Sequence, residues 1–369
     1  TLPKTIEETE KLLLSGNYVA DKSLSTSVYL SLSMNKPLFL EGEAGVGKTE
    51  LAYVLSKKLN KKLIRLQCYE GLDISSAAYE WNYPAQMIEI RLSENKSEKK
   101  DILQNIYSEN FLTKRPLLRS LEEHNGDSPI LLIDELDRTD APFEAFLLEI
   151  LSDFQLSIPE FKTIKAKKPP IIILTSNRTR EIHDALKRRC FYHWIDYPSF
   201  ERELNILKIQ LPMISEQLNE EVVKFVQELR KQDLYKLPGV AETIDWASSI
   251  SNLNKNSLEK ETIENTLGVL LKYQDDITKI KGEDVENTDD EQCTRREGER
   301  NIQMHGYEDI DKSEHASKED VHRATKPVDL DRAQAALDAA ARPNETAAKG
   351  QLDGAHQAPH GIQRDEVGQ

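Results

Sequence analysis

Apolar residues along the first 200 positions follow two alternating patterns. Short continuous apolar runs, bounded by polar or small residues, fall at 37–40, 63–68, 129–135, 171–177 and 191–197. Apolar residues spaced three or four positions apart occupy stretches between and after these runs, notably 47–59, 141–154 and 180–189. Short buried strands that alternate with helices are typical of a parallel sheet covered on both faces. The pattern predicts an α/β fold with a parallel five-stranded sheet.

The pattern changes after Pro198, where the strand-like runs stop. Helical periodicity follows at 200–210, 216–231, 240–252 and 257–273. We therefore predict two ordered domains, which are an α/β domain over 1–197 with an insertion around 75–125, and a small all-helical domain over 198–281.

Composition sets the last segment, 282–369, apart from the rest. It holds 21 acidic and 11 basic residues, no Phe or Trp, and Tyr307 as its single aromatic residue. A segment this polar cannot bury enough apolar surface to offset the entropy lost on ordering. We predict that 282–369 is an acidic, disordered tail.

Charge and cysteine content narrow the function classes. The formal net charge is −15 and the pI is near 5.2, which argues against a large sequence-independent surface for nucleic acid. Cys68, Cys190 and Cys293 lack zinc or iron–sulfur spacing, and indicate reduced thiols in the cytoplasm. No apolar run approaches the length of a transmembrane helix. The acidic, amphipathic N-terminus is unlike a signal peptide.

The stretch "LFLEGEAGVGKTELAYVL" (38–55) joins a predicted strand to a predicted helix through glycines, and fits the Walker A pattern G-x-x-x-x-G-K-[ST]. Glycines let backbone N–H groups turn inward around phosphate oxygens, and the following helix N-terminus favours anionic charge. We expect Lys48 to reach the β- and γ-phosphates and Thr49 to bind Mg²⁺. The expected nucleotide-binding residues are Gly42, Glu43, Ala44, Gly45, Val46, Gly47, Lys48, Thr49 and Glu50.

An acidic pair follows another predicted strand, in "ILLIDE" (130–135). Asp134, at the strand end, is suited to hold the Mg²⁺ shell. Glu135 is suited to activate the attacking water as a general base. The alternative is that the acidic residues only cap the next helix.

A polar residue also ends the strand "IIILTSN" (171–177). The carboxyl ends of parallel strands meet at one edge of a sheet, so we expect Asn177 to lie near Glu135. A neutral amide there can orient a water without adding charge. The alternative is an Asn that begins a turn.

With these three motifs in this order, the chain resembles the AAA+ ATPases, which are P-loop NTPases with a helical lid domain. The stretches "LLIDELDRTDAPFEAFLLEILSDFQLSIPE" and "PGVAETIDWA" resemble the MoxR branch. The phrases "EWNYP", "TSNRTRE" and "CFYHWIDYP" resemble the CoxD-like subgroup, associated with maturation of molybdenum-containing carbon monoxide dehydrogenase. The resemblance covers roughly residues 12–276.

The resemblance implies a homo-oligomeric ring, usually a hexamer, with ATP at the subunit interfaces. Asn177 would be sensor 1, and the arginine finger would come from "LKRRC" (186–190), with Arg189 favoured over Arg188. A finger supplied to the neighbouring subunit stabilises charge on the transferred phosphoryl group. The alternative is that these basic residues only complement the partial negative charge at the C-terminus of a helix.

The resemblance also suggests two further nucleotide contacts and one missing contact. Tyr18 and Val19 would line the adenine pocket, unless they only pack the N-terminal segment. Arg138 is either a second interface arginine or a member of a surface ion pair. Many AAA+ proteins place a sensor 2 arginine at the start of a lid helix, but "KLPGVAETIDWA" (236–247) has no arginine there.

The insertion contains "YEWNYPAQMIEIRL" (79–92), whose alternation resembles a hairpin rim. Its aromatic residues, Tyr79, Trp81 and Tyr83, would either grip a client or pack against the module itself.

The sequence therefore predicts a Mg²⁺-dependent ATPase of the MoxR branch that remodels or matures a client. Following the subgroup, the client would be a molybdenum hydroxylase, and a protein with a von Willebrand factor A domain would be a partner. No stable nucleic-acid complex is expected. A nucleic-acid-linked motor, such as a restriction NTPase subunit, and a nucleotide-gated scaffold with negligible turnover are the alternatives. A GTPase is excluded because no N-K-x-D motif follows the fourth strand.

Overall fold

A computed structural model of the chain describes residues 2–93, 105–124, 126–255 and 257–282. The described residues up to Thr278 form the first of two units. The tail predicted at 282–369 lies, apart from Gly282, outside the described residues. No helix within the described ranges has the length and apolar character needed to cross a membrane.

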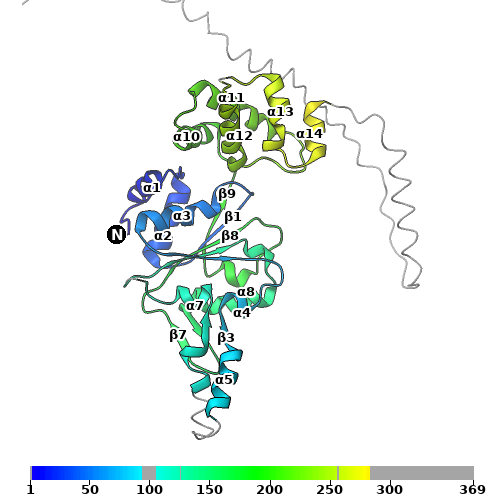
Figure 1. Cartoon of the computed structure of the whole chain (residues 1–369). Helices are drawn as coiled ribbons and strands as arrows, with labels where there is room; N and C mark the ends of the chain where they lie inside the picture. The colour runs from blue at the N-terminus through cyan, green and yellow to red at the C-terminus, as the bar shows by residue number, and fades with distance from the viewer. Residues whose placement is uncertain (1, 94–104, 125, 256, 283–369) are drawn as a thin grey trace, which may run out of the picture. The chain divides into compact units, whose positions relative to one another are not determined.

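The core of the first unit is a parallel sheet of five strands in the order β2-β5-β8-β1-β9 (Figure 1). The strands are β1 Leu38–Gly42, β2 Leu63–Gln67, β5 Ile130–Asp134, β8 Ile171–Ser176 and β9 Phe191–Ile195. β1 overlaps the run at 37–40 and extends two residues beyond it, and each of the other four strands lies within a run that the sequence predicted. The predicted α/β fold is confirmed.

Alternate residues of the central strands supply two separate cores. In β1, Leu38 and Leu40 pack on one face of the sheet, whereas Phe39 packs on the other. In β5, Leu132 and Ile133 divide in the same way. Because both faces are apolar, both need a cover of helices, which explains why these strands read as continuous apolar runs.

Helices from different parts of the chain cover the two faces. The Leu38 face carries α1 Ile6–Ser15, α2 Lys22–Met34 and α3 Lys48–Leu59. The Phe39 face carries α4 Ile74–Ala77, α7 Pro116–Ser120, α8 Ala141–Asp153 and α9 Asp184–Lys187. The helix predicted over 180–189 is thus only four residues long. It starts late because the ring of His183 accepts a hydrogen bond from the Ala185 N–H and caps it.

The prediction of a hairpin rim at 79–92 is wrong, because most of this stretch is helical. Only β3 Tyr79–Trp81 is extended, and it pairs with β4 Leu112–Lys114, which follows the short helix η1 Glu109–Phe111. Helix α5 then begins at Tyr83 and runs to Ser93. Asn82 favours this start because its side chain accepts from the Ala85 N–H, and Pro84 suits a first helical turn.

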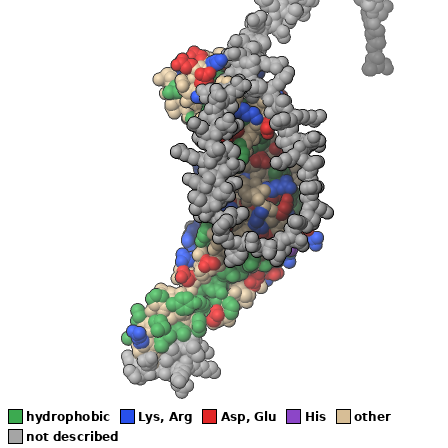
Figure 2. Space-filling view, turned by 90° about the vertical axis from the view of Figure 1, so that its right-hand side faces the viewer, with side chains coloured by type: hydrophobic (Ala, Val, Ile, Leu, Met, Phe, Trp, Pro, Cys, Tyr) green, Lys and Arg blue, Asp and Glu red, His purple; other side chains and the backbone are tan. Residues whose placement is uncertain are grey.

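The aromatic residues of the insertion separate accordingly. Trp81 is buried and meets the rings of Tyr107 and Phe161 edge-on. Figure 2 shows hydrophobic side chains gathered at the lower end of the view, where α5 lies. The exposed apolar residues of α5 are Tyr83, Met87, Ile88 and Leu92.

Within the described residues, only helices follow the last strand of the sheet: α10 Phe200–Gln210, α11 Glu216–Leu229, α12 Val240–Asn252, α13 Lys260–Leu270 and α14 Gln274–Lys281. A buried ion pair joins the first three. The Glu203 carboxylate accepts hydrogen bonds of 2.7 Å from both terminal nitrogens of Arg230 and one of 2.9 Å from Thr243 Oγ1. Because each partner is satisfied, the pair fixes how these helices pack. Three shorter elements lie between β5 and β8: η2 Leu136–Arg138 and the strands β6 Gln155–Ser157 and β7 Thr163–Lys165, which pair antiparallel.

Candidate nucleotide-binding site

The loop between β1 and α3 has the backbone that the Walker A pattern predicts. Gly47 lies in the left-handed region at φ 90°, directly before the first residue of α3. Gly42 has no room for a side chain, because a Cβ there would lie 2.1 Å from the carbonyl oxygen of Ile195. The loop therefore turns sharply between strand and helix, which leaves its N–H groups available to phosphate.

Lys48 reaches back over this loop. Its side chain is buried, and Nζ donates to the carbonyl oxygens of Gly42, at 2.8 Å, and Glu43. Burial lowers the pKa of Lys48 to about 8, although the acidic side chains of Glu43, Asp137 and Asp134 oppose that shift. A cation held in the loop is suited to bind phosphate oxygens.

The metal end of the site is centred on Asp134. Its Oδ1 accepts from Thr49 Oγ1 at 2.9 Å and from Thr175 Oγ1 at 2.6 Å, and its Oδ2 accepts from Arg65 Nε at 3.0 Å. A carboxylate beside a hydroxyl offers the oxygen ligands that Mg²⁺ prefers. Thr49 and Asp134 therefore fit the predicted metal role.

Glu135 follows at the end of the strand, in the left-handed region at φ 57°. Its N–H donates to Thr175 Oγ1 at 3.0 Å, so the same hydroxyl orients both acidic residues. The Glu135 carboxylate lies 2.8 Å from Arg138 Nε. Within one chain Arg138 thus forms an ion pair, the second of the two roles the sequence left open.

Asn177 lies directly after β8 and lines the same cavity as Glu135. Its N–H donates to the buried carboxylate of Asp137 at 3.2 Å, and Thr179 donates to that carboxylate through N–H and hydroxyl. Burial raises the pKa of Asp137, but these hydrogen bonds outweigh it and hold the pKa below its usual value. Asp137 is thus the residue that orients the Asn177 backbone.

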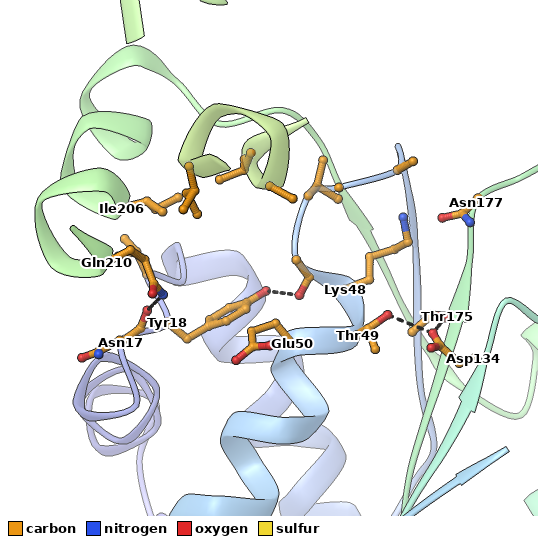
Figure 3. Close-up of a pocket in the computed structure, with 18 of the residues that line it drawn as sticks. Asn17, Tyr18, Lys48, Thr49, Glu50, Asp134, Thr175, Asn177, Ile206 and Gln210 are labelled. Atoms are coloured by element: carbon orange, nitrogen blue, oxygen red, sulfur yellow. Dashed lines mark hydrogen bonds between the residues drawn. The ribbon is translucent and has the colours of Figure 1, made fainter. Parts of the chain in front are cut away.

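These residues line a cavity of about 580 Å³ between the phosphate loop, the ends of the strands and the later helices (Figure 3). Of the predicted nucleotide-binding residues, all line it except Gly42 and Glu43, which contribute the carbonyls bound by Lys48. Tyr18 and Val19 also line it, and Tyr18 donates to the carbonyl oxygen of Gly47 at 3.3 Å. The cavity thus gathers residues from 17 to 244.

The two arginines of "LKRRC" do not line this cavity. Arg188 is highly exposed, with a 3.9 Å contact to Asp184. Arg189 donates through Nε to Ser152 Oγ and through Nη1 to the carbonyl oxygen of Ala185. Within one chain neither guanidinium reaches the phosphate loop.

The sequence reasoning missed several cavity residues. Thr175 precedes Asn177 by two positions, and its place inside the strand-end motif was the available signal. Arg202, Ile206 and Gln210 recur every four residues on α10 and so share one face of that helix, which lines the cavity. Val240, Ala241 and Ile244 of α12 also line it, and no motif marks them.

Residues 37–190 match the family model of the AAA domain (dynein-related subfamily). An uncharacterized protein of Staphylococcus saprophyticus is 23% identical over 59% of this chain and 78% of its own length. Gas vesicle ATPase GvpN of Haloferax mediterranei is 24% identical over 54% of this chain and 58% of its own. The RuvB Holliday junction branch migration motor of Thermotoga maritima superposes with a TM-score of 0.38, at 16% identity, over 73% of this chain and 72% of its own.

The arrangement supports phosphoryl transfer to water. When bound, Mg²⁺ neutralises phosphate charge, which is the main catalytic need of this reaction. Lys48 and the loop would bind phosphate, Thr49 and Asp134 would hold the metal, and Glu135 and Asn177 line the same cavity. Residues 37–190, which match the AAA domain (dynein-related subfamily), therefore hold the site of an ATPase that uses ATP with Mg²⁺.

Proposed function

We propose that this ATPase works as a MoxR-type homo-oligomeric ring, a hexamer, whose ATP hydrolysis remodels or matures a client protein in the cytoplasm. One observation carries the ring: among the described residues, Arg202 is the sole arginine that lines the cavity. Its guanidinium donates to the Val19 carbonyl oxygen and to Asp21, at the end of the cavity away from the metal. A second cation at the phosphates would then come from a neighbouring subunit.

The sequence hypothesis places that cation at Arg189, with Arg188 as the second candidate. Both arginines are exposed, and Arg189 donates hydrogen bonds to Ser152 and Ala185 within its own chain. Single Arg188→Ala and Arg189→Ala variants distinguish them, because loss of the finger is expected to reduce kcat by about 10³-fold or more. The exposed Arg119 provides a matched control, Arg119→Ala.

Mixed rings test whether the finger acts between subunits. Subunits with Lys48→Ala lack the phosphate cation, and subunits with the finger variant lack the arginine. If the two groups act across an interface, mixing the two inactive proteins restores part of the activity at hybrid interfaces. No recovery in any mixture, with assembly verified by light scattering, contradicts a finger in trans.

For the client, we propose a molybdenum hydroxylase of the carbon monoxide dehydrogenase kind, with a von Willebrand factor A domain protein as partner. The support is the likeness of "EWNYP", "TSNRTRE" and "CFYHWIDYP" to the CoxD-like subgroup. The test is capture with Glu135→Gln, which is expected to retain ATP and its partners. Recovery of DNA alone excludes maturation and favours a nucleic-acid motor, whereas gas vesicle proteins would group this chain with its GvpN-named relatives.

A further inference from the structure

The first turn of α12 lies directly on the phosphate loop. The Ala241 N–H donates to the carbonyl oxygen of Gly45 at 3.1 Å. A Cβ on Gly239 would lie 2.6 Å from the Ala44 carbonyl oxygen and 2.9 Å from Gly45 Cα. The backbone of Gly239 therefore packs directly against the backbone of the phosphate loop, too close for any residue with a Cβ at position 239.

Gly239 is needed for this approach and not for its own backbone conformation. Its φ of −83° and ψ of −177° are accessible to any residue. Its N–H donates to the Glu242 carboxylate at 3.0 Å, which closes the start of the helix. The close contact is thus the physical reason for a glycine at this position.

The contact stands where a lid arginine would be expected in many AAA+ proteins. The α12 residues that line the cavity are Val240, Ala241 and Ile244, and none of them can carry charge. Backbone links from α12 to the phosphate loop are the hydrogen bond to Gly45 and the packing of Gly239 against Ala44. The hydrogen bond and the packing contact both involve peptide groups of the phosphate loop, whose conformation is expected to change when phosphate binds.

We infer that Gly239 is a positioning residue through which α12 reports the state of the phosphate loop by direct backbone contact. Rotation of the Gly45 peptide on nucleotide binding moves the acceptor of the Ala241 N–H, and the 13-residue helix α12 follows as one body. This coupling requires that the loop binds ATP, and it does not depend on which client the ring serves.

The first experiment uses hydrogen exchange of the full-length protein over residues 236–247, without nucleotide and with saturating ADP or a non-hydrolysable ATP analogue. In the wild type, nucleotide is expected to change exchange in this segment at least threefold. In Gly239→Ala the added Cβ separates helix and loop, so that difference should fall below 1.5-fold and the KM for ATP should rise about tenfold. The control is Gly268→Ala in α13, where a Cβ meets open space.

A second variant removes the hydrogen bond without adding bulk at Gly239. Ala241→Pro deletes the N–H at the second position of α12, the position that Pro142 occupies in α8. The nucleotide-dependent exchange should again be lost, with a smaller rise in KM of about threefold. Circular dichroism and intrinsic tryptophan fluorescence establish that each variant is folded.

Two results overturn the coupling. One is wild-type exchange over 236–247 that does not respond to nucleotide. The other is a full nucleotide response in folded Ala241→Pro, whether or not Gly239→Ala folds. Neither result affects client capture, so failure of this coupling is distinguishable from failure of the maturation role.

Discussion

The two ends of the nucleotide cavity are built in different ways. At the metal end, Asp134 and Thr175 are buried at neighbouring strand ends and share a hydrogen bond of 2.6 Å. At the other end, Gln210 and Asn17 are exposed, and they come from α10 and from the segment between α1 and α2. The sheet fixes the first end, whereas contacts between separate elements hold the second. Chemistry is therefore expected to depend on the metal end and affinity on the other.

Glu135 should give the largest effect at the metal end. Glu135→Gln keeps the shape of the side chain but removes the carboxylate that we propose as the base, so kcat is expected to fall by about 10²- to 10⁴-fold. ATP affinity should remain within about threefold, because the phosphate loop is unchanged. Phosphate release and nucleotide titration measure the two quantities. Glu160→Gln, at an exposed site, is the control, and equal losses in binding and turnover would contradict a base.

Thr175 should give the next largest effect. Thr175→Val keeps the volume but removes the donor to Asp134 Oδ1 and the acceptor of the Glu135 N–H. The apparent Mg²⁺ affinity, measured as the Mg²⁺ dependence of turnover, is expected to fall about tenfold, as for other residues that orient a metal ligand. Thr175→Ser retains the hydroxyl and should stay near wild type. A similar loss of Mg²⁺ affinity in Thr175→Val and Thr175→Ser would show that the side chain acts through packing and not through its hydroxyl.

At the opposite end, Gln210→Leu should affect affinity alone. The Gln210 amide donates to the Asn17 carbonyl oxygen at 3.0 Å and so ties α10 to the N-terminal segment. One such bond contributes about 1 kcal/mol, so the KM for ATP should rise about fivefold with kcat unchanged. Steady-state kinetics test this, with Gln217→Leu on α11 as the control. A fall in kcat would break the division between the two ends.

Tyr18→Phe should give the smallest effect. The lost bond to the Gly47 carbonyl oxygen is long, at 3.3 Å, and that oxygen also accepts from the Leu51 N–H. The ring remains packed, so the KM for ATP should change less than about twofold. A larger change would show that the Tyr18 hydroxyl itself contacts the nucleotide.

Local chemistry made the metal end predictable. Glycines, Lys48, Thr49, Asp134 and Asn177 each follow a recognisable strand, and parallel strands bring their ends to one edge. The end formed by α10 was not predictable, because Gln210 meets Asn17 across 193 positions of sequence. The hairpin rim was wrong for another reason: the alternation at 79–92 was a weaker signal than the helix start supplied by Asn82 and Pro84.

The sequence by itself determined the parallel sheet, the phosphate loop and the acidic strand end, since each depends on neighbours within a few residues. Only the tertiary structure decided how α12 contacts the phosphate loop. No arginine in "KLPGVAETIDWA" marks that contact, and Gly239 has an ordinary backbone conformation. Gly239 matters because it lies against Ala44, almost 200 residues earlier in the chain. A Cβ at position 239 would lie only 2.6 Å from the Ala44 carbonyl oxygen. Close approach between distant backbones leaves no local pattern, and it exists only once the chain has folded.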